Sequence, residues 1–229
     1  MHPLENVIWQ ALTTRQAPFA ESCDGARRFM REVTSLCAFE EPNDHGYTSL
    51  ARLAGPGGTA TIFLEHPYQQ RPGWEYIIGA PLLQMVCENG AAMTHSSASS
   101  EFVELGDKDS ADMLELTALT KPGPFGPRTH ELGYYVGIRD GGKLVAMAGE
   151  RLKVPGYTEV SAVCTHPDHL GKGYAGTLMT EVMRCIRERG ETAFLHVRGD
   201  NSRAIAIYER LGFRTRWAGH FAVLRKTDS

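Results

Sequence analysis

The sequence predicts a mixed α/β fold in which antiparallel strands are followed by one parallel strand, and three observations lead to this class. Two β-rich runs, 134–139 and 144–150, are joined by Asp140-Gly141-Gly142, a strong signal for a tight hairpin. A third β-rich run, 157–164, leads into a glycine-rich turn and an amphipathic helix. Another strand follows that helix, and a helical crossover makes such strands parallel.

Composition limits the classes of function. The chain has 229 residues, a net charge of −3 and a pI near 6.3, which gives no basic stripe for nucleic acid or an anionic membrane. The apolar run 76–87 is too short and too interrupted to span a bilayer, and residues 1–16 do not resemble a secretory signal. The five cysteines are widely spaced and odd in number. We therefore expect a cytoplasmic protein with reduced thiols, monomeric or homodimeric, with no nucleic-acid or membrane partner.

The chain divides at a small polar stretch, 94–100, that reads as a linker. Residues 1–100 are predicted to form a smaller α/β region, with a degenerate companion lobe as one interpretation, and residues 101–229 a second domain. In the first region we expect strands at 60–64 and 74–78 and a helix at 27–36. No chemical motif is visible there.

The second domain begins with a short strand, 101–105, and a helix, 107–119, whose first turn is acidic and so suits the helix dipole. Three prolines and two glycines make the segment 121–128 irregular. The strands 134–139, 144–150 and 157–164 then form an antiparallel meander.

The helix after Gly176 carries apolar residues at helical spacing and ends at Gly190. A strand at 194–197 follows. The next helix, 201–211, is capped by Asp200 or Asn201 and stopped by Gly212. Two further strands are expected at 213–217 and 221–224.

The glycine turn before the first of these helices predicts a phosphate site. Glycines at a helix start let a ligand approach main-chain N–H groups that have no partner inside the helix. The spacing Gly171-x-Gly173-x-x-Gly176 also matches the dinucleotide-binding fingerprint, with Asp200 as a ribose ligand. The antiparallel hairpin before it and the short chain after it argue against that alternative. A phosphate-binding P-loop, Gly-x4-Gly-Lys-[Ser/Thr], fails, because position 166 is His where Gly is required and position 173 is Gly where Ser or Thr is required.

Three segments resemble the GNAT superfamily of acyl-CoA-dependent N-acyltransferases: residues 163–176, 195–201 and 204–213. The family's turn, [Arg/Gln]-x-x-Gly-x-[Gly/Ala], is matched at Gly173 and Ala175, whereas Leu170 stands where Arg or Gln is usual. The resemblance covers residues 101–224. It implies a GNAT-like fold and an N-acetyltransferase that uses acetyl-CoA as acyl donor, without a metal.

The resemblance also implies cofactor contacts. The pyrophosphate of coenzyme A would lie on the main chain of the turn, and the pantetheine arm would pair with the strand before it. Val163 N–H would donate to the thioester carbonyl. The residues implied in cofactor binding are Val163, Cys164, Thr165, Leu170, Gly171, Lys172, Gly173, Tyr174, Ala175, Gly176 and Asn201. Asn201 can instead be only a helix cap, and Lys172 can be only a solvated turn residue.

Two residues are predicted to be catalytic. Tyr208 would face the coenzyme sulfur and protonate the leaving thiolate, although a place in the core is the alternative. Glu159 falls where some family members carry a general base, and period-two alternation would put it on the same face as Val163. Its alternative is a solvated strand glutamate. Cys164 would then point to the opposite face, as a buried small hydrophobe.

The acceptor is expected to be the amine of a small molecule or peptide, bound beside the loop 121–132 through Phe125, Arg128 and His130. His166 and His169 lack a third ligand nearby, so no metal is expected. The predicted function is direct transfer of an acetyl group to a primary amine in a ternary complex. The alternative is a catalytically silent acyl-CoA sensor or scaffold.

Overall fold

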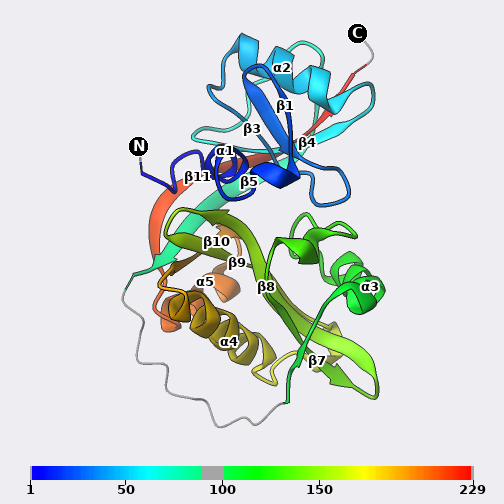
Figure 1. Ribbon diagram of the computed structural model, residues 1–229, viewed down its shortest axis with the longest axis vertical. Coiled ribbons are helices and arrows are strands. Elements are labelled where there is room, and N and C mark those ends of the chain that lie inside the picture. The colour runs from blue at the N-terminus through cyan, green and yellow to red at the C-terminus, as the bar shows by residue number, and fades with distance from the viewer. Residues whose placement is uncertain (1, 89–100, 228–229) are drawn as a thin grey trace.

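The computed structural model describes residues 2–88 and 101–227, and the predicted linker 94–100 lies outside them. Its main feature is an eight-stranded mixed sheet in the order β4-β11-β5-β10-β9-β8-β7-β6 (Figure 1). The predicted mixed α/β class is confirmed. Within the described residues, no helix is long and apolar enough to cross a bilayer.

The predicted antiparallel meander is present. It comprises β7 (Tyr135–Asp140), β8 (Lys143–Val154) and β9 (Tyr157–Thr165), with the short β6 (Val103–Glu104) at the edge. Gly141 and Gly142 join β7 to β8 with φ values of 56° and 85°, the left-handed region that a two-residue hairpin turn requires.

A helix crossover carries the chain from β9 to the parallel strand β10 (Thr192–Arg198). This helix, α4 (Tyr174–Glu188), buries Leu178, Val182 and Ile186 completely, at the helical spacing seen in the sequence. The second helix, α5 (Ser202–Arg210), follows β10, and Asn201 caps it by accepting the Ala204 N–H at 3.1 Å.

Strands from both sides of residue 100 share the main sheet. β4 (Thr59–Leu64) pairs with β11 (Arg214–Lys226), and β5 (Trp74–Cys87) lies between β10 and β11. The division into a region 1–100 and a domain 101–229 stays a prediction. The two strands expected at 213–217 and 221–224 are instead one strand, because a register shift between Thr215 and Trp217 lets β11 follow β5 without a break.

A second, three-stranded sheet lies in the N-terminal part, formed by β1 (Ala20–Cys23), β2 (Ala26–Phe29) and β3 (Cys37–Phe39). The helix expected at 27–36 is therefore wrong. Arg28 pairs with Cys37 across β2 and β3, and the turn between them holds the β-branched Val33 and Thr34. Two helices pack here, α1 (Val7–Thr13) and α2 (Asp44–Ala54).

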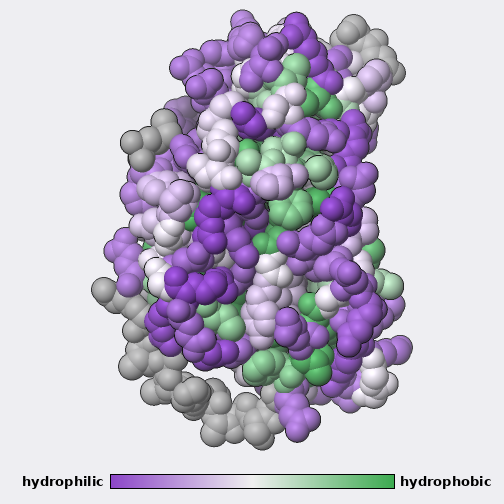
Figure 2. Space-filling view, in the orientation of Figure 1, coloured by the Kyte–Doolittle hydropathy of each residue, from purple (hydrophilic) through white to green (hydrophobic). Residues whose placement is uncertain are grey.

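The main sheet is covered on both faces. α4 and α5 cover one face, and α1 and α3 (Ser110–Thr120) pack on the other (Figure 1). Neighbouring residues of β10 point to opposite faces of the sheet, so that Leu195 packs toward α4 and Phe194 toward α1. Figure 2 shows apolar residues where the N-terminal elements meet the rest of the sheet, with hydrophilic residues around them. Four 3₁₀ turns among the described residues complete the chain: Ala17–Phe19, Asp107–Asp109, Thr129–Leu132 and Pro167–His169.

Candidate active site

The two parallel strands separate soon after they begin. Residues 157–159 of β9 pair with residues 192–194 of β10, and the recorded pairing ends there. Farther along, β10 continues against β5 as far as Arg198, while β9 runs on to Thr165 against β8. The edge of β9 that faces β10 is thus left without a strand partner. Such an edge can pair with an extended ligand through its main chain.

A bulge interrupts β9 at the point where the strands separate. Ala162 has φ = 53°, and the register moves from Ser161 opposite Gly149 to Cys164 opposite Met147. One extra residue in β9 therefore faces the same length of β8. A bulge of this kind re-aims the groups beside it, here including the Val163 N–H.

The bulge also corrects the predicted alternation. Val160 and Val163 both pack toward α4, although they are three residues apart. Ala162 and Cys164 pack on the opposite face, toward α3. Glu159, next to Val160, lies on that same opposite face. The expectations that Glu159 shares a face with Val163, and that Cys164 points away from Glu159, are therefore wrong.

Cys164 itself is buried, as predicted, and burial raises the pKa of its thiol to about 11. The thiol is protonated at neutral pH and is no nucleophile. Any contact of Cys164 or Thr165 with an extended ligand along β9 would have to come from the main chain.

The glycine turn is an open cradle of main-chain donors. Gly171 and Gly173 have φ values of 82° and 80°, and α4 begins directly after them with no side-chain cap and no acidic residue in its first turn. A Cβ built at Gly171, Gly173 or Gly176 would meet nothing within 4 Å. The first N–H groups of α4 therefore face open space, as binding of a diphosphate requires.

Side chains around the turn are sparse. Leu170 is 51% exposed and offers no polar atom, as the sequence indicated. The Lys172 ammonium lies 3.2 Å from His169 Nδ1 and over the Tyr174 ring at 5.8 Å. It remains next to the cradle, where its charge can screen a phosphate.

Tyr208 packs from α5 against the same core as α4, with its ring 6.2 Å from Phe213. Burial raises the pKa of its hydroxyl to about 12, and this hydroxyl has no hydrogen-bond partner among the described residues. It is absent from the fully buried unpartnered atoms, so it retains access to solvent. A neutral donor without a partner is available to a ligand.

Glu159 occupies a very different environment. Its side chain is 0% exposed and forms a bidentate ion pair with Arg151, with N–O distances of 2.9 and 2.8 Å. His196 Nδ1 lies 2.6 Å from one oxygen, and the Leu152 N–H donates to the other at 3.2 Å. Burial alone would raise the pKa of Glu159, but Arg151 and His196 outweigh it and lower the pKa to about 2. The geometry does not support the predicted general-base role, since the carboxylate is both enclosed and very weakly basic.

Sequence reasoning missed the partners of Glu159. The Gln84 amide nitrogen lies 3.2 Å from His196 Nε2, on the side of the ring opposite the Nδ1 that contacts Glu159. Gln84 comes from β5, far away in sequence, and no spacing rule connects it to β9. The sequence did indicate Arg151 in one way: together with Glu150 it is a charged residue that directly follows the uncharged run 144–149 of β8.

The three predicted acceptor contacts differ in their availability. Arg128 is held by Glu131 at 2.6 and 2.7 Å, and His130 lies 2.7 Å from Asp107. Phe125 packs inward, with its ring edge-on to Tyr135 at 6.0 Å, and the His130 side chain is also largely buried, at 8% exposed. The Tyr135 hydroxyl is buried without a partner among the described residues, so the wall beside Phe125 contains an unused polar group.

Comparisons with known proteins agree with this geometry. Residues 135–222 match the model of the FR47-like protein family. A putative acetyltransferase of the GNAT family from Novosphingobium aromaticivorans superposes with a TM-score of 0.89 at 34% identity, over 99% of this chain and 100% of that one. A GCN5-related N-acetyltransferase from Kribbella flavida shares the fold, with a TM-score of 0.60 at 16% identity over 98% of this chain and 94% of that one.

Two curated relatives match over shorter stretches. The N-alpha-acetyltransferase RimI of Mycobacterium tuberculosis is 38% identical over 84 residues, 35% of this chain and 52% of the relative. A mycothiol acetyltransferase from Saccharomonospora viridis is 45% identical over 58 residues, 25% of this chain and 19% of the relative. The matched stretches thus span about half or less of these two relatives. Because the match to the Novosphingobium protein covers that chain completely at 34% identity, this chain belongs to the GNAT family of acetyltransferases.

Proposed function

We propose that this protein transfers the acetyl group of acetyl-CoA to a primary amine by direct attack in a ternary complex. The observation that carries the proposal is the separation of β9 from β10 at the Ala162 bulge, directly before an uncapped glycine turn. Main-chain groups of β9, the glycine turn and the start of α4 would then lie along the length of an extended thiol cofactor.

The main chain would hold the cofactor. The N–H groups of residues 171–176 face open space and would bind the diphosphate, with Lys172 beside them. The free edge of β9 at 163–165 would pair with the pantetheine arm. Asn201 uses its carbonyl oxygen as a cap, which leaves its amide group to donate to that arm. When bound, acetyl-CoA supplies the thioester that the amine attacks.

Two groups would act on the reacting atoms. The Val163 N–H, beside the bulge, would donate to the thioester oxygen as negative charge develops there. Tyr208 would donate a hydrogen bond to the leaving sulfur. Its pKa of about 12 lies above that of an ordinary thiol, about 8.5, so it stabilises the thiolate as a donor and does not transfer its proton completely.

The acceptor is proposed to be an amine of low pKa, such as a peptide α-amine. Glu159 is locked in its ion pair, so the amine must lose its proton without help from that carboxylate. Reaching the neutral form at pH 7 costs about 1.4 kcal/mol for an α-amine and about 4.6 kcal/mol for a lysine side chain. The name of one relative, an N-alpha-acetyltransferase, is consistent with this preference.

A panel of amines tests the proposal. We expect free thiol to be released from acetyl-CoA, together with the acetylated product, faster with dipeptides that have a free α-amine than with lysine blocked at its α-amine. For the α-amines, log(kcat/KM) should rise with pH up to the pKa of the amine itself. A lysine preference would contradict the proposed substrate class.

Two observations favour a second candidate. Leu170 removes a polar contact at the turn, and Glu159 is unavailable as a base, which together would suit a silent acyl-CoA sensor. The same panel decides between the two. Calorimetric binding of acetyl-CoA without thiol release for every amine would identify the sensor.

A further inference from the structure

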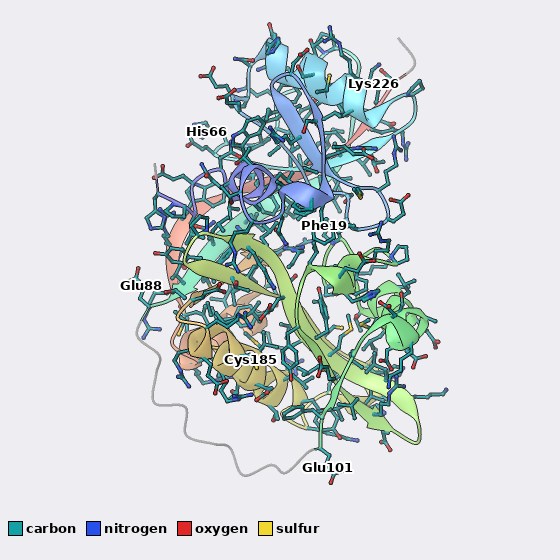
Figure 3. The ribbon with its side chains drawn as sticks, in the orientation of Figure 1. Phe19, His66, Glu88, Glu101, Cys185 and Lys226 are labelled. Atoms are coloured by element: carbon teal, nitrogen blue, oxygen red, sulfur yellow. The ribbon has the colours of Figure 1, made fainter. Side chains whose placement is uncertain are left out.

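A cavity lies in the N-terminal part of the molecule, away from α4 and the glycine turn. It has a volume of about 140 Å³ and opens between β2, β3 and the start of β4. Phe19, labelled in Figure 3, marks the neighbouring segment: its carbonyl accepts the N–H of Met30, where the turn 30–35 begins. The lining residues are Arg28, Phe29, Arg31, Thr34, Ser35, Cys37 and Thr59.

The lining is positively charged. It contains two arginines and no carboxylate. Arg28 is buried and forms an ion pair with Glu21 at 2.5 Å that compensates its charge, so the net positive charge of the lining comes from Arg31. Arg31 donates to the carbonyl of Ala54 at 2.6 Å, which orients its guanidinium without neutralising the charge.

The remaining polar groups of the lining do not offset this charge. Burial, opposed by Arg28, raises the pKa of the Cys37 thiol to about 12, so the thiol is neutral. Ser35 is engaged with Thr61, 2.8 Å away. Thr34 is different: it is 2% exposed, and its hydroxyl has no partner among the described residues. A buried hydroxyl without a partner is rare; Thr34 is one of the residues that line the cavity, and a ligand reaches this hydroxyl when the turn 30–35 shifts.

The turn that lines the cavity is also joined to the proposed acceptor loop. The carbonyl of Glu32 accepts the Arg128 N–H at 2.9 Å, and that of Val33 accepts the Thr129 hydroxyl. A Cβ at Gly126 would lie 2.5 Å from the Glu32 carbonyl, so the two segments are in close contact. A ligand that steadies residues 30–35 would therefore steady the loop as well.

We propose that this cavity binds a small oxyanion, a phosphate or a carboxylate group, between the guanidinium groups of Arg28 and Arg31 and the hydroxyl of Thr34. Guanidinium forks and a hydroxyl donor match the acceptor atoms of such an anion. The bound anion holds the turn 30–35 against the loop 121–132. The site is separate from the glycine turn, and its existence does not depend on the proposed acetyl transfer.

Calorimetric titration of the full chain with inorganic phosphate, and separately with acetate and citrate, tests the binding. Excess CoA is present so that the glycine turn is occupied and does not take up the titrated anion. Variants of the lining residues then show independently whether the anion binds in the cavity. Arg31→Gln should weaken uptake by about tenfold or more, because a charge-assisted contact is lost. Thr34→Val removes only a hydroxyl that has no protein partner, so it should fold normally and weaken uptake several-fold.

Arg52→Gln is the matched control, since Arg52 forms an exposed ion pair with Asp24 outside the cavity. It should leave uptake unchanged. A preference for phosphate or for the carboxylates identifies the natural class of ligand, and either supports the site. Absence of saturable uptake, or equal uptake by Arg31→Gln, Thr34→Val and the wild type, would overturn the proposal.

Hydrogen exchange tests the connection to the acceptor loop. The Arg128 amide, which donates to the Glu32 carbonyl, should exchange more slowly when phosphate is bound, and this protection should disappear in Thr34→Val. Uptake of phosphate without any change in exchange over residues 121–132 would refute the second half of the proposal. Neither measurement requires turnover, so failure here is distinguishable from failure of the proposed acetyl transfer.

Discussion

Two polar regions of this molecule contrast in how far their groups are satisfied. At the start of α4 and at Tyr208, donors have no partner among the described residues, and the space beside the turn glycines is open. Glu159 lies three residues before Ala162 at the bulge. Both of its carboxylate oxygens accept hydrogen bonds, and its side chain is fully buried. The first region has groups that are free to act on a ligand, whereas in the second region the charged groups pair with one another and hold neighbouring strands together. A carboxylate in the right strand is therefore not by itself a catalytic carboxylate.

Glu159→Ala gives the sharpest test of this contrast and the largest expected effect. Removing one member of a buried ion pair leaves Arg151 uncompensated and should lower the free energy of unfolding by about 3–5 kcal/mol, measured in urea. Glu131→Ala is the matched control, because its pair with Arg128 is more exposed and should contribute about 1 kcal/mol or less. Full stability of Glu159→Ala together with lost turnover would return Glu159 to the catalytic role.

Tyr208→Phe addresses the opposite region. The loss of a hydrogen bond to a charged leaving group, about 1.5–3 kcal/mol, should reduce kcat by roughly 10- to 100-fold. The affinity for CoA should change little. Tyr157→Phe, whose hydroxyl is near His2 instead, should keep its kcat. An unchanged kcat in Tyr208→Phe would make Tyr208 a core residue only.

Gly173→Ala should weaken CoA binding by about tenfold, because a Cβ would stand in the cradle and the left-handed φ of 80° disfavours alanine by about 1–2 kcal/mol. Gly190→Ala controls for the strain: its φ is 73°, at the opposite end of the same helix. Both variants should lose similar stability, and Gly173→Ala alone should lose calorimetric affinity for CoA. Equal affinities would show that the turn does not hold the diphosphate.

The smallest expected effect concerns the pH dependence of the free energy of unfolding, and it is absent at neutral pH. The pKa of Glu159 is lowered in the fold from 4.5 to about 2, so its contribution is complete above pH 4.5 and is lost as the pH falls toward 2. Unfolding midpoints of Glu159→Gln should accordingly depend less on pH than the wild type across this window. Between pH 6 and 8 the two curves should run parallel. A divergence there would indicate that another group titrates with Glu159.

Local patterns predicted most of the fold after residue 101. The Asp140-Gly141-Gly142 hairpin, the apolar face of α4 and the Asn201 cap are each decided by nearby residues, and each is present in the structure. The helix expected at 27–36 failed because pairing with β3 overrides the local helix preference.

The candidate site was less accessible to prediction. The glycine turn depends on its own sequence and could be identified directly. The prediction that Glu159 shares a sheet face with Val163 assumed strict alternation along the strand. The bulge at Ala162, with φ = 53°, adds one residue between them and puts them on opposite faces. The partners Arg151, His196 and Gln84 come from three strands, and only the folded sheet brings them together.

The order of strands has a consequence for how the protein is made. β11 lies between β4 and β5, and both of these leave the ribosome long before it does. Until β11 emerges, each of them exposes an edge to solvent. The sheet can therefore close only after β11 has emerged, and nascent chains should depend on chaperones more than those of a protein built from local contacts.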